Sequence, residues 1–175
     1  HAIAPSHLQE DYDNAGLITG HEEMTISGVL VCLDAIESIV DEAIVLGCNV
    51  IVAHHPIVFR GLKRFNGNNY VERTIIKAIK HDIAIFAIHT NLDNVFIDGV
   101  NTVICNKLGL INLQILSIKP DVTHLQYPVG AGMVGELTTA LSTHKFLEHL
   151  KQSMELQVIK HTNLCRDTIQ KVAVC

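Results

Sequence analysis

The N-terminal part of the chain alternates between short apolar runs and segments whose apolar residues recur at helical spacing. We expect strands at 28–33, 50–53 and 83–88, and helices at 35–46, 71–80 and 99–108. Gly47, directly after the first helical segment, is a typical C-terminal stop. Strands that alternate with helices form parallel sheets covered by those helices. The predicted fold class is therefore α/β, with a largely parallel or mixed sheet flanked by helices.

The C-terminal part is less regular. Residues 129–137 are rich in glycine, and residues 142–154 have the spacing of a helix. We expect short strands at 157–160 and 171–175. Because the chain stops inside the second of these apolar runs, we also expect the intact protein to continue beyond Cys175.

Histidines follow two of the predicted strands. The run 50–53 ends in His54, His55 and a proline, and the run 83–88 is followed by His89 and, four residues later, by Asp93. Because the carboxyl ends of parallel strands meet at one edge of a sheet, we expect these side chains to gather there. Imidazole nitrogen and carboxylate oxygen are ligands for zinc, iron, manganese, nickel and cobalt. The sequence therefore predicts a metal site at this edge.

The paired histidines have a second interpretation. His54 and His55 are also compatible with hydrogen-bonded polar residues at a strand end, with Pro56 stopping the strand. If they do bind metal, neighbouring strand residues point to opposite sides, so they serve two ions, or one binds while the other orients. A dinuclear centre needs about three protein ligands for each ion. With Asp93 and His89, this chain offers too few.

Three further polar clusters are candidates for contact with a ligand. The segment Asp11–Leu17 favours a structured turn before the first strand, with a substrate-facing loop as the alternative. Arg60 and Lys63 follow the paired histidines, and they either bind an anion such as phosphate or lie in a solvated loop. His144 and Glu148 share one helix face, for which we expect exposure to solvent rather than metal binding.

Composition excludes several classes of function. The 13 lysine and arginine residues against 18 acidic ones give a net charge of −5, and no basic stripe supports nucleic-acid binding. The apolar runs are far shorter than the ~18 residues that span a bilayer, and no signal peptide is visible. The 5 cysteines form no C-x-x-C pair, which indicates reduced thiols and a cytoplasmic protein.

Five segments, in this order, resemble the Nif-three-like family, whose members are also known as type 2 homologues of GTP cyclohydrolase I. They are D-Y-D-N-A-G-L at 11–17, G-V-L-V-C-L-D at 28–34, A-H-H-P-I-V-F at 53–59, H-T-N-L-D at 89–93 and G-A-G-M-V-G-E-L at 130–137. The resemblance implies an α/β fold with a dinuclear metal centre and a toroidal homohexamer. It implies that His54, His55 and Asp93 are metal ligands. It places His89 beside the metals, where it contacts substrate or transfers a proton.

The chain departs from the family pattern in two places. The family completes its metal site with a C-terminal H-x-x-x-E motif, which has no counterpart here. Long members also carry an inserted domain, and residues 121–127 resemble the end of such an insert. We therefore expect missing residues near Pro120 and after Cys175. On this interpretation residues 1–120 form the first half of the metal-binding domain and residues 121–175 an incomplete second half.

The function implied by the resemblance is that of a metal-dependent hydrolase. Two divalent ions, zinc as the first candidate, would activate water against a C–N bond, with a guanine nucleotide as the suggested small-molecule substrate. Two alternatives stay open: a non-catalytic metal-binding regulatory protein, and a two-metal phosphoesterase.

Overall fold

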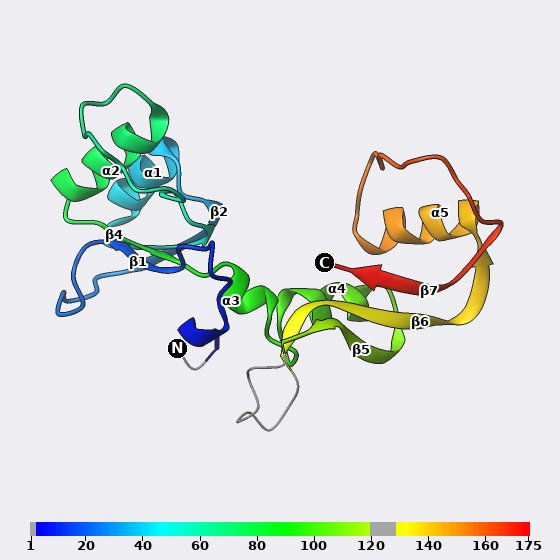
Figure 1. Ribbon diagram of the computed structural model, residues 1–175. Helices are drawn as coiled ribbons and strands as arrows, with labels where there is room; N and C mark the ends of the chain where they lie inside the picture. The colour runs from blue at the N-terminus through cyan, green and yellow to red at the C-terminus, as the bar shows by residue number, and fades with distance from the viewer. Residues whose placement is uncertain (1–2, 120–128) are drawn as a thin grey trace. The chain divides into compact units, whose positions relative to one another are not determined.

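The computed structural model describes residues 3–119 and 129–175 (Figure 1). Their contacts divide the chain into two compact units, His1–Leu92 and Asp93–Cys175. The division into halves 1–120 and 121–175 concerned the family fold as a whole and stays a prediction. Residues near Pro120, where an insert was expected, lie partly outside the described ranges.

The first unit is built on a four-stranded mixed sheet in the order β1-β4-β3-β2. The strands β2, β3 and β4 run parallel, and β1 lies antiparallel to β4. Its elements are a 3-10 helix (Ser6–Leu8), β1 (Gly16–Thr19), β2 (Val29–Asp34), α1 (Glu37–Leu46), β3 (Val50–His55), α2 (Tyr70–Lys80) and β4 (Ala84–Ala87). The short α3 (Thr90–Asp93) crosses the boundary between the units. The predicted α/β class is confirmed, and β1 is a strand that the sequence analysis did not predict.

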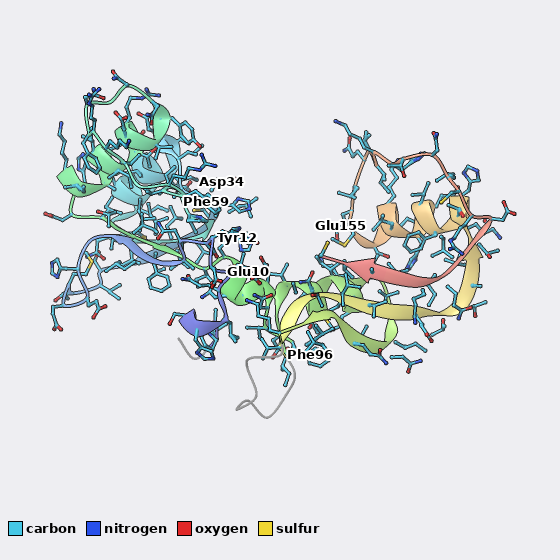
Figure 2. All side chains as sticks on the ribbon, in the orientation of Figure 1. Glu10, Tyr12, Asp34, Phe59, Phe96 and Glu155 are labelled. Atoms are coloured by element: carbon cyan, nitrogen blue, oxygen red, sulfur yellow. The ribbon has the colours of Figure 1, made fainter. Side chains whose placement is uncertain are left out.

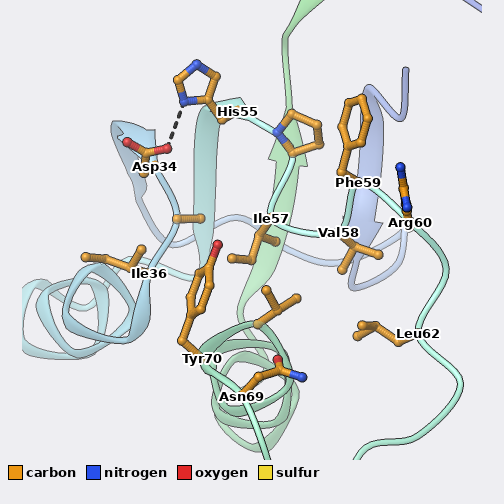
Figure 3. A pocket seen from close by; sticks show the side chains of 13 residues that line it. Asp34, Ile36, His55, Ile57, Val58, Phe59, Arg60, Leu62, Asn69 and Tyr70 are labelled. Carbon is orange, nitrogen blue, oxygen red and sulfur yellow. Dashed lines mark hydrogen bonds and ion pairs between the residues drawn. The ribbon is translucent and has the colours of Figure 1, made fainter. Parts of the chain in front are cut away.

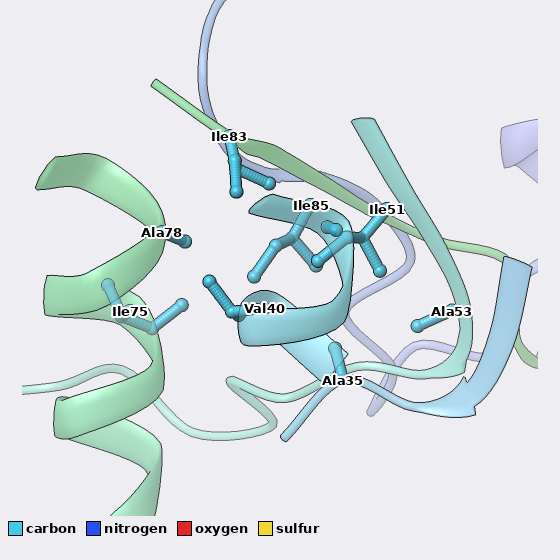
Figure 4. Packing of buried hydrophobic residues seen from close by; sticks show 9 residues of the cluster. Ala35, Val40, Ile51, Ala53, Ile75, Ala78, Ile83 and Ile85 are labelled. Atoms are coloured by element: carbon cyan, nitrogen blue, oxygen red, sulfur yellow. The ribbon is translucent and has the colours of Figure 1, made fainter. Parts of the chain in front are cut away.

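The helices α1 and α2 pack on the sheet and enclose the core of the first unit (Figure 4). Val40 from α1, Ile75 from α2, and Ile51 and Ile85 from the central strands belong to one buried cluster. Ile51 and Ile85 have no exposed surface, and burying such a side chain contributes about 1.5–3 kcal/mol. Gly47 ends α1 in the left-handed region, with φ of 68°, as its position predicts.

A reciprocal cap fixes the start of α2. The Asn69 side chain accepts a hydrogen bond from the Glu72 backbone N–H at 2.9 Å. The Glu72 carboxylate in turn accepts from the backbone N–H groups of Asn66 and Asn68 at 3.2 and 3.0 Å. Burial raises the pKa of Glu72, but these hydrogen bonds outweigh it and hold the pKa below its usual value. The cap orders the end of the loop that joins β3 to α2.

The second unit carries a three-stranded antiparallel sheet in the order β5-β6-β7. Its elements are α4 (Val100–Lys107), β5 (Ile111–Ile118), β6 (Gly130–Ser142), α5 (Thr143–Ser153) and β7 (Thr168–Val174). The glycine-rich segment forms β6, and its glycines let β5 approach closely. A Cβ on Gly130 would lie 2.0 Å from the Ser117 carbonyl oxygen. The predicted strand at 157–160 is wrong, because no strand of the described residues pairs with it.

Among the residues that the structure describes, no helix combines the length and the hydropathy needed to cross a membrane.

Candidate metal centre

Three imidazoles converge at one edge of the first unit's sheet. His54 and His55 end β3, and His89 follows β4, which runs parallel beside β3 with Ala53 opposite Ala87. One ring nitrogen from each histidine lies within 4.8 Å of the other two. The ring centroids are 4.9 Å apart for His54 and His55, 5.4 Å for His54 and His89, and 5.7 Å for His55 and His89. We call these three residues the histidine cluster.

Each imidazole of the histidine cluster is oriented through its Nδ1 atom. The acceptors are the Ile88 carbonyl oxygen for His54 at 2.9 Å, the Asp34 carboxylate for His55 at 2.8 Å and the Asp13 carboxylate for His89 at 2.7 Å. A carbonyl oxygen and an ionised carboxylate only accept hydrogen bonds, so Nδ1 carries the proton in all three rings. In the neutral ring Nε2 then holds the lone pair, which is the arrangement of metal-binding histidines.

The pair between His55 and Asp34 is open to solvent. Their side chains are 47% and 58% exposed, so their hydrogen bond adds little to stability and mainly orients the imidazole. Asp34 ends β2, the strand beside β3, and its backbone lies opposite His55. The predicted strand order also places Asp34 at this edge, but no local pattern shows its hydrogen bond to His55.

Asp13 is the buried partner of His89. Its side chain has no exposed surface, and it also accepts hydrogen bonds from the Thr90 backbone N–H at 3.0 Å, the Thr90 hydroxyl and the Asn14 backbone N–H at 2.7 Å. Burial raises the pKa of Asp13, but the hydrogen bonds from Thr90, His89 and Asn14 outweigh it and lower the pKa below its usual value. The carboxylate is therefore ionised at neutral pH and fixes the His89 ring.

The loop that carries Asp13 is hydrogen-bonded to the segments that follow β3 and β4. The Glu10 backbone N–H donates to the Thr90 hydroxyl at 2.9 Å, and the Asn14 side chain donates to the Val58 carbonyl at 2.6 Å. We call residues 10–14 the N-terminal arm. The overlapping segment Asp11–Leu17 was predicted to be a turn or a substrate-facing loop, and its role in orienting His89 was not predicted. No spacing rule shows a contact between residues 76 positions apart.

Aromatic side chains border the histidine cluster. The Phe59 ring meets His89 edge to face with centroids 6.4 Å apart, and Tyr12 of the N-terminal arm lies 6.4 Å from Phe59 (Figure 2). Both rings are more than 40% exposed. They form an apolar border beside polar imidazoles, as in many sites that bind small molecules.

The other sequence candidates are not members of the histidine cluster. Asp93 ends α3 and belongs by its contacts to the second unit, so its assignment as a metal ligand stays a prediction. His144 and Glu148 are exposed on α5, as expected, and neither belongs to a group of three metal-binding side chains within residues 3–119 and 129–175. Arg60 and Lys63 both lie in the loop between β3 and α2.

Comparison with known proteins gives one consistent family. A model of the Duf34/NIF3 family (NGG1p interacting factor 3) matches residues 1–175. The chain is 32% identical over 170 residues to the GTP cyclohydrolase 1 type 2 homolog of Clostridium acetobutylicum, covering 97% of this chain and 61% of that protein. It is 42% identical over 118 residues to the homolog of Staphylococcus aureus strain MRSA252, covering 67% of this chain and 32% of the relative.

Solved structures agree. A Bacillus cereus protein related to NIF3 superposes with a TM-score of 0.88 at 26% identity, covering 98% of this chain and 72% of that one. Reduced HcgD from Methanocaldococcus jannaschii gives a TM-score of 0.70 at 27% identity, covering 86% and 55%. The chain thus spans about three fifths of the length of the clostridial relative.

Proposed function

The chain belongs to the Duf34/NIF3 family, and on that premise we propose that it is a metal-dependent hydrolase whose histidine cluster lies at the reaction centre. The observation that carries the proposal is the shared orientation of the three imidazoles. Each Nδ1 atom is held by an oxygen acceptor, which leaves the Nε2 lone pair of each ring to bind an ion or to accept a proton. A structural role at a strand end would not require three rings fixed in the same tautomer.

The donor set fits a divalent ion of the first transition row, with zinc as our first choice. When bound, such an ion supplies a Lewis acid that lowers the pKa of water towards neutrality. His54 and His55 would hold two ions together with Asp93 and ligands beyond those described. Asp34 keeps the His55 ring in place, and the Ile88 carbonyl does the same for His54.

His89 has a different role in this proposal. Because the buried Asp13 carboxylate holds the proton on Nδ1, the Nε2 atom of His89 is a base that takes a proton during attack by water and returns it to the leaving nitrogen. The names of the relatives support a cyclic C–N bond of a guanine nucleotide as the target. We further propose that the protein acts in the cytoplasm as a homohexamer.

The first experiment measures metal. We expect purified protein to hold divalent metal by elemental analysis, and His54→Ala and His55→Ala to lose it. His144→Ala is the matched control, because that imidazole is exposed on α5 and outside the histidine cluster. Equal metal content in all four proteins would contradict the assignment.

The second experiment measures turnover. We expect the metal-loaded protein to release formate from GTP, and both chelation and His89→Ala to abolish the release. Release of nitrophenol from p-nitrophenyl phosphate without action on GTP would favour the phosphoesterase instead. Metal binding without turnover on either compound would contradict the hydrolase and favour the regulatory alternative.

A further inference from the structure

A pocket of about 700 Å³ opens beside His55, between the ends of β2 and β3 and the starts of α1 and α2 (Figure 3). This volume lies within the range of pockets that bind small molecules. Its walls are mainly apolar and come from Ile36, Ile57, Val58, Phe59, Leu62 and Tyr70. His55 and its partner Asp34 form one side.

The pocket gathers large side chains that the fold itself leaves uncovered. Ile36, Phe59 and Tyr70 are 41%, 46% and 55% exposed. Figure 3 shows the Tyr70 ring standing in the pocket, with its hydroxyl directed towards the side where Asp34 and His55 lie. An exposed apolar concavity with few polar groups is typical of a site for a ligand with a flat or apolar body.

One cationic side chain lines this pocket. Arg60 is exposed, and no ion pair to it is recorded among the described residues, whereas Arg73 pairs with Glu37 and Lys77 with Asp41. The acid that lines the pocket, Asp34, is hydrogen-bonded to His55. A guanidinium in this position is available for a carboxylate or phosphate group, which it can bind through two parallel hydrogen bonds.

The pocket and the histidine cluster share a wall. His55 belongs to both, and Phe59 lines the pocket while its ring contacts His89. A ligand in the pocket would therefore present one end to the histidine cluster.

We propose that the pocket binds a flat, mainly apolar ring compound that carries one anionic group, with the ring against Phe59 and Tyr70 and the anion on Arg60. This ligand is distinct from the guanine nucleotide of the proposed function, and its binding does not depend on bound metal.

The test uses 2-naphthoate and its neutral counterpart 2-naphthamide, titrated by calorimetry into chelator-treated protein. We expect saturable binding of both, with 2-naphthoate roughly tenfold tighter because of the charged hydrogen bond to Arg60. Arg60→Gln should weaken 2-naphthoate to the level of 2-naphthamide. Phe59→Ala should weaken both compounds.

Lys80→Gln is the matched control, since it removes a cation from the far end of α2 and should leave the tenfold preference intact. Equal affinity of the two compounds for the unaltered protein, or a preference that survives Arg60→Gln, would overturn the inference. The calorimetry uses metal-free protein, so its outcome is independent of the elemental analysis. If the protein prefers 2-naphthoate but the elemental analysis finds no metal, only the proposed function is contradicted.

Discussion

Replacing Asp13 by asparagine tests whether this residue sets the protonation of the His89 ring. The Asp13 carboxylate accepts hydrogen bonds from His89 and Asn14 on one oxygen and from the backbone N–H and hydroxyl of Thr90 on the other. An asparagine has one oxygen, which accepts hydrogen bonds, and one NH₂ group, which only donates them. One of the two pairs of donors therefore faces the NH₂ group and loses its acceptor. Thr90 is buried and Asn14 exposed, and water can replace the partner only of Asn14.

We therefore expect the amide oxygen to stay with Thr90 and the NH₂ group to face His89. The imidazole then accepts at Nδ1 and carries its proton on Nε2, which removes the lone pair that the proposed reaction uses. The loss of charged hydrogen bonds to a fully buried group should lower the free energy of unfolding by about 1.5–3 kcal/mol at neutral pH.

The assay has two measurements on metal-free protein. Long-range proton–nitrogen spectra at a pH where the ring is neutral report the tautomer, and urea unfolding reports stability. The folded pKa of Asp13 lies below its ordinary value of 3.8, so its stabilisation is present above that value and is lost as the pH falls through the folded pKa. The stability difference between the two proteins should therefore shrink at the acid end.

Asp11→Asn provides the control, because it makes the same charge change at an exposed position of the N-terminal arm. The reasoning is refuted if Asp13→Asn keeps the proton on Nδ1 of His89 and changes stability by less than about 0.5 kcal/mol.

Three further predictions concern the framework. Ile85→Ala should lower the free energy of unfolding by about 2–5 kcal/mol in urea melts, since the side chain is fully buried, whereas Val45→Ala at an 85% exposed position should change it little. Gly130→Ala should destabilise by about 1–3 kcal/mol or more, because its Cβ meets the opposite strand at 2.0 Å, while Gly61→Ala has open space; equal thermal midpoints would contradict this account. Glu72→Gln should make the free energy of unfolding fall less steeply as the pH is lowered, because the folded pKa of Glu72 lies below its usual value. The same dependence of the melting temperature on acidic pH in both proteins would contradict the role of the cap.

The α/β core of the first unit follows from local patterns. The central strands β3 and β4 are apolar runs that carry buried core residues. The edge strand β2 instead alternates, because Val29, Val31 and Leu33 are exposed while Leu30 and Cys32 pack against the core. The helices α1 and α2 each pack one side on this core, so helical spacing and burial agree there. The second unit is different, because β6 contains glycines that favour no strand by themselves. They are required by the closeness of β5, which only the pairing reveals. The segment 157–160 shows the converse, since its β-branched residues Val158 and Ile159 form no strand without a partner strand.

The candidate site was predictable only in part. Parallel strands explain why His54, His55 and His89 meet, because topology places their strand ends together. The oxygen atoms that orient the imidazoles were not predictable, because they come from another strand end, a backbone carbonyl and the N-terminal arm. Orientation is a property of contacts distant in sequence, whereas residue type and strand position are local.

Ligand binding at the histidine cluster and closure of the N-terminal arm are thermodynamically linked. Its bonds to Thr90, His89 and Val58 hold only while the arm is closed, and His89 is aligned only while they hold. A ligand that needs the aligned ring must bind the closed arm more tightly than the open one, and so protects it by RT ln(1 + [L]/Kd). Amide exchange at Asn14 and Thr90 should therefore slow as ligand is added, because exchange follows the population of the open arm, and the exchange rate then reports how much of the site is occupied.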